Sequence, residues 1–371
     1  MIKLIKSTFH NEEDTKEKLA DFIKSAKQLS FGPECVKFEN NFSKYQGRKH
    51  CIFFNSGSSA NLALIQALLN TGKIKKGDKV GFSAVTWATN VMPLIQLGLD
   101  VSPIDIEIET LNVSSKKLIE FLDKNEIKAL LLTNLLGFCD DIDKIKNVCK
   151  EKDIILLEDN CESLGTVYKG EKLGNFGLAG TFSFYVGHHM STVEGGAVCT
   201  DDDRLASMLK KVRAHGWDRN LDDSRRKELI DNHGIESEFY SRYTFYDLGY
   251  NLRPTEINGF LGNVQLKYLD EIVEKRKDNF NKLSGAIYGQ TDNYFPLKSH
   301  HIDVVSNFAV PVVCRSKEIR DDLIKKCEGK IEVRPIVGGD MTSQPFFKKY
   351  TPSHDFECPN AKFVHENGLY F

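Results

Sequence analysis

The stretch CIFFNSGSSAN at residues 51–61 joins a short apolar run to a turn of small residues and the start of a helix. Residues 51–54 are typical of a strand, and an apolar helical pattern begins near Leu62. Between them, Gly57 lets the backbone come close to a ligand, while serine hydroxyls, first-turn amides and the helix dipole favour an anion. The turn therefore predicts a phosphate site, and helix capping by its serines is the alternative interpretation.

Outward from this turn, short apolar runs alternate with helical patterns as far as about residue 215. Further strands are predicted at residues 79–82, 100–106, 128–133, 154–158, 181–185 and 197–200, and helices at residues 115–123 and 141–150. Such alternation favours an α/β fold with a mainly parallel sheet, in which ligands bind at the carboxyl ends of the strands. Residues that directly follow the predicted strands are therefore the first candidates for a functional site.

The two ends of the chain carry different patterns. An opening helix that packs on the main domain is predicted from apolar residues at three- and four-residue spacing, namely Leu19, Phe22, Ile23, Ala26 and Leu29. The charge-rich residues 218–236 predict an excursion or lid, and a strand–helix–strand pattern from about residue 304 predicts a smaller second domain. We expect a large domain at residues 1–245 and a small C-terminal α+β domain at residues 246–371.

Composition and charge exclude several classes of protein. The 371 residues carry 50 Lys and Arg against 52 Asp and Glu, and this net charge of −2 lacks the basic excess of a nucleic-acid binder. No apolar run approaches the roughly 18 residues of a membrane helix, and residues 1–14 lack a secretory apolar core, so we expect a cytoplasmic protein that binds no membrane. Nine cysteines without Cys-x-x-Cys or Cys-x-Cys spacing argue for free thiols and against a zinc or iron–sulfur site.

Two further groups that follow predicted strands could hold a planar cofactor. Glu158 and Asp159 come after an apolar run, where a carboxylate could pair with a protonated ring nitrogen and make a bound pyridoxal ring an electron sink. Helix N-capping by Asp159 is the alternative. Trp87 also lies just past a strand, so its flat ring could cover a face of the cofactor or belong to the core.

The most specific segment is SFYVGHHMSTVEGG at residues 183–196. It resembles the active-site signature of the sugar aminotransferase and dehydratase family of fold-type I pyridoxal phosphate (PLP) enzymes, Ser-Phe-x-x-x-Lys followed five residues later by x-Glu-Gly-Gly. His188 stands at the lysine position. Imidazole forms no stable imine with the cofactor, yet it can accept and return protons near neutral pH. A zinc site at His188 and His189 is disfavoured, because neighbouring side chains in extended chain point to opposite sides.

The resemblance covers nearly the whole chain, from Gly32-Pro33 through residues 249–254 to Arg334-Pro335. It implies an aspartate-aminotransferase-like fold, with a three-layer large domain around a mainly parallel sheet and a smaller C-terminal α+β domain. By the family's pattern, Gly57, Ser58 and Ser183 would hold the cofactor phosphate.

The same pattern implies the surroundings of the cofactor ring. Trp87 would stack on the ring, Asp159 would pair with the ring nitrogen, and Glu162 would lie beside the ring oxygen. Asn251 would reach across a dimer interface to the partner's cofactor phosphate. The resemblance therefore implies a homodimer with shared active sites.

Within the family, a histidine at the lysine position makes this segment resemble that of the 3-dehydratases of nucleotide-linked 4-keto-6-deoxy sugars. This resemblance implies a hydro-lyase that binds PLP and pyridoxamine phosphate non-covalently, with no internal aldimine and with L-glutamate as amino donor. The expected substrate is a GDP-linked 4-keto-6-deoxy sugar, which would lose its C3 hydroxyl with His188 as acid and base. His215, Arg253 and Arg334 would contact the substrate, and the 3,6-dideoxy product would serve a surface polysaccharide such as O-antigen or capsule.

Several alternatives stay open. A GDP-linked 4-keto-6-deoxy-heptose could undergo the same reaction, since one hydroxymethyl group changes selectivity little. A related dehydratase class uses an iron–sulfur cluster and a reductase partner, but the isolated Cys139, Cys149 and Cys161 do not match its cluster pattern. An ordinary aminotransferase would lack its lysine. A catalytically inactive sugar-nucleotide-binding relative is the competing class, and the retained Asp159 and Ser183 argue against it.

Overall fold

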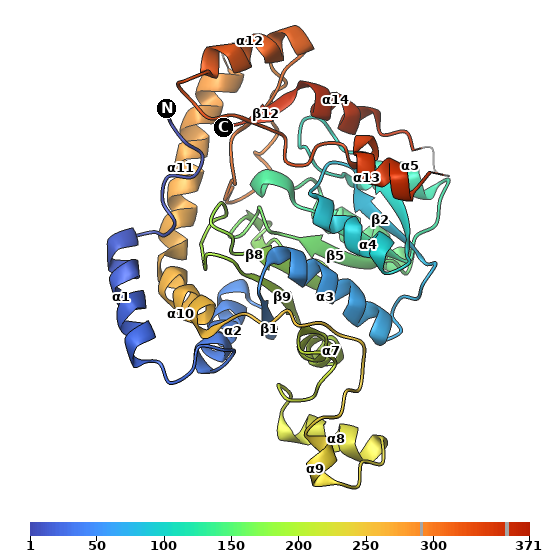
Figure 1. Ribbon diagram of the computed structural model, residues 1–371. Coiled ribbons are helices and arrows are strands. Elements are labelled where there is room, and N and C mark those ends of the chain that lie inside the picture. Colours follow the sequence, from blue (N-terminus) through green and yellow to red (C-terminus); the bar gives the residue numbers. More distant parts are fainter. Residues whose placement is uncertain (290–291, 353–355) are drawn as a thin grey trace.

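A seven-stranded sheet in the order β1-β9-β8-β5-β4-β2-β3 forms the centre of the molecule (Figure 1). The structure is a computed structural model that describes residues 1–289, 292–352 and 356–371. The strands of this sheet are β1 (His50–Phe54), β2 (Lys79–Ser83), β3 (Asp100–Ile104), β4 (Ala129–Thr133), β5 (Ile155–Asp159), β8 (Ala179–Ser183) and β9 (Gly196–Thr200).

Every strand of the sheet overlaps a predicted one, and the mainly parallel arrangement is confirmed. The ladders that join β3, β2, β4, β5 and β8 are parallel, whereas β9 pairs antiparallel with both β8 and β1. Two strands end two residues earlier than predicted, β3 at Ile104 and β8 at Ser183. Beyond Ser183 the chain leaves the sheet, and the His188 N–H donates to the Tyr185 carbonyl at 2.8 Å in a turn past the carboxyl edge.

Helices cover both faces of the sheet and complete three layers. One face is covered by α3 (Gly57–Asn70), α4 (Met92–Gln96) and α7 (Asp203–Arg213). The other face is covered by α2 (Pro33–Gln46), α5 (Ser115–Leu122), α6 (Ile142–Glu151) and α11 (Leu269–Tyr288). Successive side chains of a strand point to opposite faces, so Leu130 and Leu131 enter different cores and β4 is apolar up to its last residue, Thr133.

The opening helix is shorter than its apolar pattern predicts. α1 (Glu12–Ser25) packs on α10 (Glu256–Gln265), where the rings of Phe22 and Phe260 stack with centroids 4.4 Å apart. The helix ends because Ala26 adopts an extended conformation, so Leu29 lies beyond it. Leu29 and Ile23 are exposed, and the predicted burial of these two side chains is therefore wrong.

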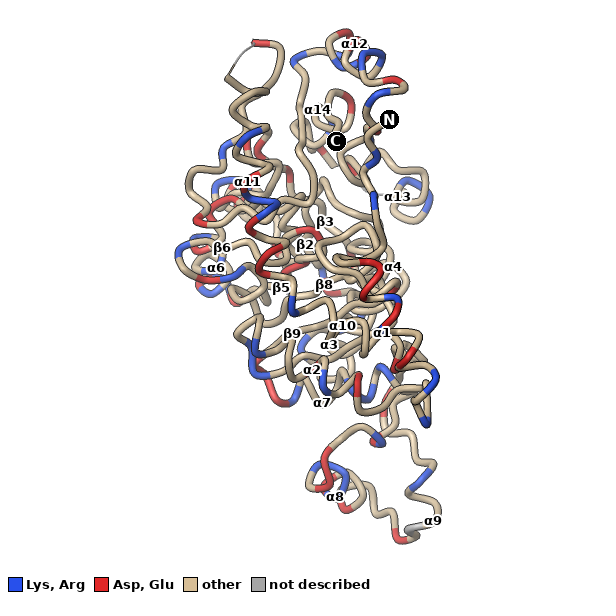
Figure 2. The backbone as a smooth tube through the Cα atoms, turned by 90° about the vertical axis from the view of Figure 1, so that its left-hand side faces the viewer, with Lys and Arg blue, Asp and Glu red and all other residues tan. Residues whose placement is uncertain are grey.

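Residues 218–236 form an excursion, as predicted. α8 (Asp223–Asn232) and α9 (Glu238–Ser241) project from the body in both views of the backbone (Figures 1 and 2). No residue of α8 is buried, and the nearby side chains of Phe239, Tyr240 and Leu248 are 70% or more exposed.

A second sheet of three antiparallel strands lies at the C-terminal end of the chain, in the order β10-β12-β11. Its strands are β10 (Pro311–Val313), β11 (Arg334–Pro335) and β12 (Gly368–Tyr370). α12 (Lys317–Cys327) connects β10 to β11, which confirms the predicted strand–helix–strand pattern. The predicted domain boundary between residues 245 and 246 stays a prediction.

The remaining elements are short and lie at the edges of these layers. They are η1 (Ala88–Asn90), η2 (Leu135–Gly137), β6 (Val167–Tyr168), β7 (Glu171–Lys172), η3 (Leu266–Tyr268), η4 (Met341–Ser343), α13 (Pro345–Tyr350) and α14 (Pro359–Asn367). Within the described ranges, no helix has the length and apolar character needed to cross a membrane.

Candidate active site

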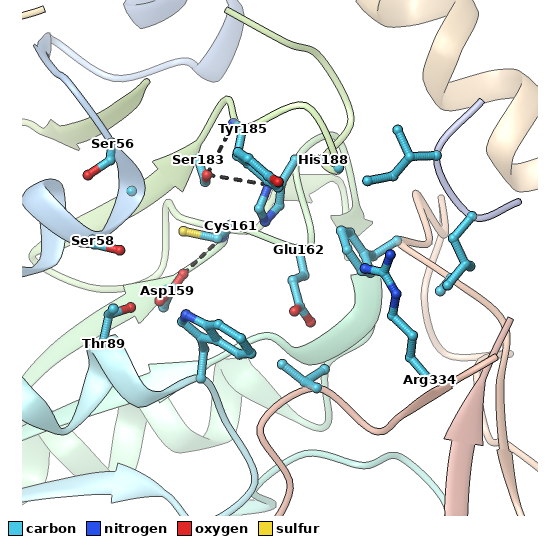
Figure 3. Close-up of a pocket in the computed structure, with 18 of the residues that line it drawn as sticks. Ser56, Ser58, Thr89, Asp159, Cys161, Glu162, Ser183, Tyr185, His188 and Arg334 are labelled. Carbon is cyan, nitrogen blue, oxygen red and sulfur yellow. Dashed lines mark hydrogen bonds between the residues drawn. The ribbon is translucent and has the colours of Figure 1, made fainter. Parts of the chain in front are cut away.

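A cavity of about 430 Å³ lies at the carboxyl edge of the large sheet, next to the second sheet (Figure 3). Residues from distant parts of the chain meet there, which agrees with the expected position of a ligand in an open α/β sheet. Eight predicted site residues line it: Gly57, Ser58, Trp87, Asp159, Glu162, Ser183, His188 and Arg334. Among the described residues that line the cavity there is no lysine.

Three predicted residues lie elsewhere in this chain. His215, Asn251 and Arg253 do not line the cavity, and His215 is exposed. They belong to two adjacent segments, since the His215 N–H donates to the Tyr250 carbonyl and the Arg253 Nε donates to Asn251 Oδ1 at 2.9 Å. Within one chain, the structure therefore separates these three residues from the other eight.

The start of α3 forms one end of the cavity. Ser56 is the N-cap, and its Oγ accepts the Ser59 N–H at 3.0 Å, so the capping interpretation of the serine-rich turn is confirmed for this residue. Ser56, Gly57 and Ser58 also line the cavity. Gly57 and Ser58 belong to the first turn, whose N–H groups have no partner within the helix and attract anions.

Gly57 is held tightly against the end of β8. A Cβ at this position would come within 2.7 Å of the Ser183 Cβ and 3.2 Å of the Cys161 Sγ. Real Cβ atoms essentially never approach a carbon atom that closely, so a larger residue would move α3 away from Ser183. The glycine therefore sets the distance between the two sides of the proposed phosphate site.

Asp159 is the last residue of β5, and its carboxylate is buried and hydrogen-bonded. Its Oδ2 accepts from Asn61 Nδ2 at 3.0 Å, and its Oδ1 accepts from the Cys161 N–H at 2.9 Å. The chain turns after Asp159 and starts no helix there, so the helix N-cap alternative is wrong. The preceding residue, Glu158, points away and accepts from the backbone N–H groups of Gly174, Phe176 and Gly177.

Trp87 lies at the cavity rather than in a core. Its side chain is 55% exposed, although it lines the cavity together with Asp159. The core alternative is therefore wrong for this residue, and its ring is available to cover a flat ligand.

His188 is half-buried and its ring has few partners. The ring Nδ1 lies 3.4 Å from the Ser183 Oγ, and the ring of Phe308 lies 5.3 Å away between centroids (Figure 3). Burial, and to a smaller extent the charge of Arg276, lowers the pKa of His188 to about 4. The imidazole is therefore neutral at pH 7 and can accept a proton. His189 does not line the cavity and directs its Nε2 to the Ser306 carbonyl instead.

Glu162 presents a carboxyl group to the cavity with one hydrogen bond. Its Oε2 accepts the Leu136 N–H at 2.9 Å. Loss of solvation, and then the nearby charge of Asp159, raises the pKa of Glu162 to about 8, against the effect of the Leu136 N–H. At pH 7 this carboxyl group is largely protonated and can donate a hydrogen bond.

The sequence profile of the DegT/DnrJ/EryC1/StrS aminotransferase family matches residues 10–370. The chain belongs to this family.

Several relatives within the DegT/DnrJ/EryC1/StrS family are similar over almost their full length. GDP-4-keto-6-deoxy-D-mannose 3-dehydratase from Yersinia pseudotuberculosis is 36% identical over 360 residues, which cover 94% of this chain and 88% of the relative. A crystal structure of GDP-4-keto-6-deoxymannose-3-dehydratase with a trapped PLP-glutamate geminal diamine has a TM-score of 0.90 and 33% identity, and the match covers 100% of this chain and 95% of that chain. A mutant of GDP-4-keto-6-deoxymannose-3-dehydratase with bound GDP-perosamine has a TM-score of 0.88 and 32% identity, with coverage of 100% and 95%.

The sequence pattern did not predict several of the residues that line the cavity. Leu4, Phe308 and Tyr370 line it although they lie far from Asp159 in the sequence and belong to no recognisable motif. Arg276 of α11 donates to the carbonyls of His188, Asn307 and Phe308, but a single arginine on a long helix gives no signal. Cys161 lies two residues after Asp159, and only the structure shows that it lines the cavity.

Proposed function

We propose that this protein catalyses the PLP- and glutamate-dependent C3 dehydration of a GDP-linked 4-keto-6-deoxy sugar. The observation that carries the proposal is a neutral histidine, His188, in a cavity whose described lining contains no lysine. A lysine-free site cannot hold PLP through an imine to the protein, while imidazole can still move protons. Relatives that are 36% and 33% identical are GDP-4-keto-6-deoxymannose 3-dehydratases.

The residues of the cavity fit PLP. The tight approach of Gly57 to Ser183 leaves no room for a side chain at the first turn of α3, which suits an anionic phosphate held by backbone amides and the Ser58 and Ser183 hydroxyls. The exposed ring of Trp87 suits a flat cofactor, and the buried Asp159 suits a protonated ring nitrogen. When bound, PLP supplies an electron sink and a carrier for the amino group of glutamate.

The chain's own residues then hold the substrate and move protons. The ring nitrogen of His188 would accept the proton that leaves C4′ of the bound cofactor and return it to the C3 hydroxyl of the sugar, which leaves as water when the C3–O bond breaks. General acid–base help of this kind contributes about 10²–10⁴-fold in rate. Glu162, protonated at pH 7, can donate a hydrogen bond to an oxygen beside it, and the Asp159 carboxylate is held at the cavity by its two hydrogen bonds.

Recognition of the GDP-sugar is proposed to involve charged residues and a second copy of the chain. Arg334 brings a cation to the cavity, and we assign it, with His215 and Arg253, to substrate binding. We assign Asn251 to the partner subunit's cofactor phosphate in a homodimer. The exposed apolar side chains beside the α8–α9 excursion support such an interface; they are Phe239, Tyr240, Tyr243, Phe245 and Leu248. A cytoplasmic location is also proposed, since the nine free thiols suit a reducing compartment.

The proposal is tested by incubating the protein with PLP, L-glutamate and GDP-4-keto-6-deoxy-mannose. Ammonia, 2-oxoglutarate and the mass of the sugar product are followed together, with His188→Asn as the matched variant. Release of ammonia and 2-oxoglutarate with a 3,6-dideoxy-4-keto product is expected. An amino sugar would instead indicate an aminotransferase, and turnover only with the GDP-linked heptose would change the substrate. Binding of PLP and GDP-sugar without any conversion would contradict catalysis.

A further inference from the structure

We propose that Asn61 is a positioning residue that fixes the Asp159 carboxylate for the cofactor's ring nitrogen, an inference that rests on the proposed function. Asn61 lies on α3, one turn after Gly57, and neither the sequence pattern nor the lining of the cavity gives it a role. It acts behind Asp159 and does not face the cavity itself.

The contact to Asp159 is one part of a buried network. Asn61 Nδ2 donates to Asp159 Oδ2 at 3.0 Å and to Asn90 Oδ1 at 2.8 Å. Asn90 Nδ2 in turn donates to the Oγ1 atoms of Thr86 at 2.8 Å and Thr133 at 2.6 Å, and these two hydroxyls lie 2.6 Å apart. Asn61, Asn90 and Thr86 are 1% exposed or less, so bulk water does not replace these bonds.

The network fixes which way both amides face. If Asn61 were flipped, its Oδ1 would face the Asp159 carboxylate and the Asn90 Oδ1, and acceptor would meet acceptor. Asn90 cannot flip either, because its Oδ1 is needed to accept from Asn61. Asn61 therefore presents an N–H group to Asp159, and a hydrogen bond donated to a carboxylate favours its charged form.

The position of Asn61 on α3 links the two ends of the proposed cofactor site. Gly57 and Asn61 are four residues apart and thus lie on the same side of the helix, one turn from each other. One rigid helical turn therefore sets the separation between the phosphate amides and the ring-nitrogen carboxylate. Trp87 is joined to the same network, because it follows Thr86 and its carbonyl accepts the Asn90 N–H at 3.0 Å.

The test compares Asn61→Leu with Gln46→Leu on α2 as a matched control. Gln46 is also buried and donates through its amide, but to the Leu173 carbonyl at 2.8 Å and to Asn175 Oδ1 at 3.0 Å, and it does not line the cavity. Dissociation constants for PLP and the pH dependence of the bound cofactor's absorbance are measured without substrate. Asn61→Leu should weaken PLP binding roughly 10- to 100-fold, the effect of losing a hydrogen bond to a charged group, and shift the absorbance titration to lower pH. Gln46→Leu should leave both unchanged.

A double-mutant cycle with Asp159→Asn separates positioning from a merely structural role. If Asn61 acts through Asp159, Asn61→Leu should cost much less PLP affinity in the Asp159→Asn background than in the wild type. An equal cost in both backgrounds would overturn the inference. Should Asn61→Leu fail to fold, Asn61→Asp keeps the shape and faces Asp159 with a second carboxylate, and it should weaken PLP binding further as the pH rises.

Failure of the inference is distinguishable from failure of the proposed function. If the wild type binds PLP and Asn61→Leu binds it equally tightly with the same absorbance titration, only the positioning role is wrong. If the wild type binds no PLP, the proposed function is wrong and the inference fails with it.

Discussion

Asp159 and Glu162 are three residues apart and line the same cavity, yet their carboxyl groups differ in hydrogen-bond partners and solvation. Asp159 accepts hydrogen bonds at both oxygens, from Asn61 and from the Cys161 N–H, and a buried network stands behind it. Glu162 accepts a single bond, from the Leu136 N–H, and loss of solvation raises its pKa to about 8. Loss of solvation with a single donor therefore leaves Glu162 largely protonated at pH 7, whereas Asp159 has a donor at each oxygen.

His188 belongs with Glu162 in this comparison, and we refer to the two residues as the desolvated pair. Its pKa is lowered to about 4 because burial penalises the charged imidazolium, and Arg276 adds a like charge nearby. Both members of the pair are thus neutral at pH 7, one as a proton donor and one as a proton acceptor. Such a division of roles in one site is typical of acid–base catalysis.

The largest expected effect comes from removing the proton acceptor of the desolvated pair. His188→Asn should lower turnover by about 10²–10⁴-fold, because the asparagine amide can neither accept nor return a proton near neutral pH. PLP affinity should change little, since the Asp159 network is untouched. The measurement is ammonia release under saturating GDP-sugar, with His50→Asn on β1 as the control, which should retain full activity. Turnover of His188→Asn within a few-fold of the wild type would show that the base is another residue.

The next effect concerns the proton on Glu162. Its pKa in the folded chain, about 8, lies above the ordinary value of 4.5, so the folded state binds more protons than the unfolded state between these pH values. The contribution of Glu162 to stability is therefore fully present below pH 4.5 and is lost as the pH rises through 8. Glu162→Gln should remove a negative slope of at most about 1.4 kcal/mol per pH unit, the limit for one proton.

Urea unfolding of the cofactor-free protein between pH 5 and 9 measures this slope. Glu194→Gln is the control, because Glu194 also lines the cavity but is exposed to solvent. An unchanged slope in Glu162→Gln would mean that Glu162 is solvated like Glu194, and the contrast between Asp159 and Glu162 would then disappear.

A smaller effect tests how closely α3 packs against Ser183 beside the cavity. Gly57→Ala should destabilise the protein by about 1–3 kcal/mol, because the added methyl group would meet the Ser183 Cβ at 2.7 Å. PLP binding should weaken as well, since α3 must move from Ser183. Chemical denaturation and a PLP titration check the two effects, and an alanine variant with unchanged stability would contradict the tight approach.

The smallest effect is expected at a glycine remote from the cavity. Gly285 lies inside α11, and a Cβ built there meets no atom within 4 Å. Gly285→Ala should therefore stabilise the protein by about 0.5–1 kcal/mol through helix propensity, with unchanged PLP affinity. Chemical denaturation measures this change in stability. A loss of stability would show that the open space around Gly285 does not explain the difference expected between Gly285→Ala and Gly57→Ala.

The sequence by itself determined the sheet, the edge at which the site lies and eight of the residues that line the cavity. Short apolar runs specify β1 to β5, β8 and β9 because a strand covered on both faces must be apolar throughout. Gly57 and Asp159 were found because each comes just after a predicted strand. Ser183 and His188 were found through the resemblance to a family signature of closely spaced residues, from which His188 departs. These are local patterns, which a linear sequence displays directly.

Only the tertiary structure decided how those residues behave. Asn61 reaches Asp159 across 98 positions, Arg276 reaches the His188 carbonyl across 88, and Tyr370 joins the cavity from the other end of the chain. The exposed positions of Ile23 and Leu29 likewise depend on where α1 ends and what lies beside it. Solvation and hydrogen-bond partners set the protonation of a buried group, and both exist only once distant segments have packed together.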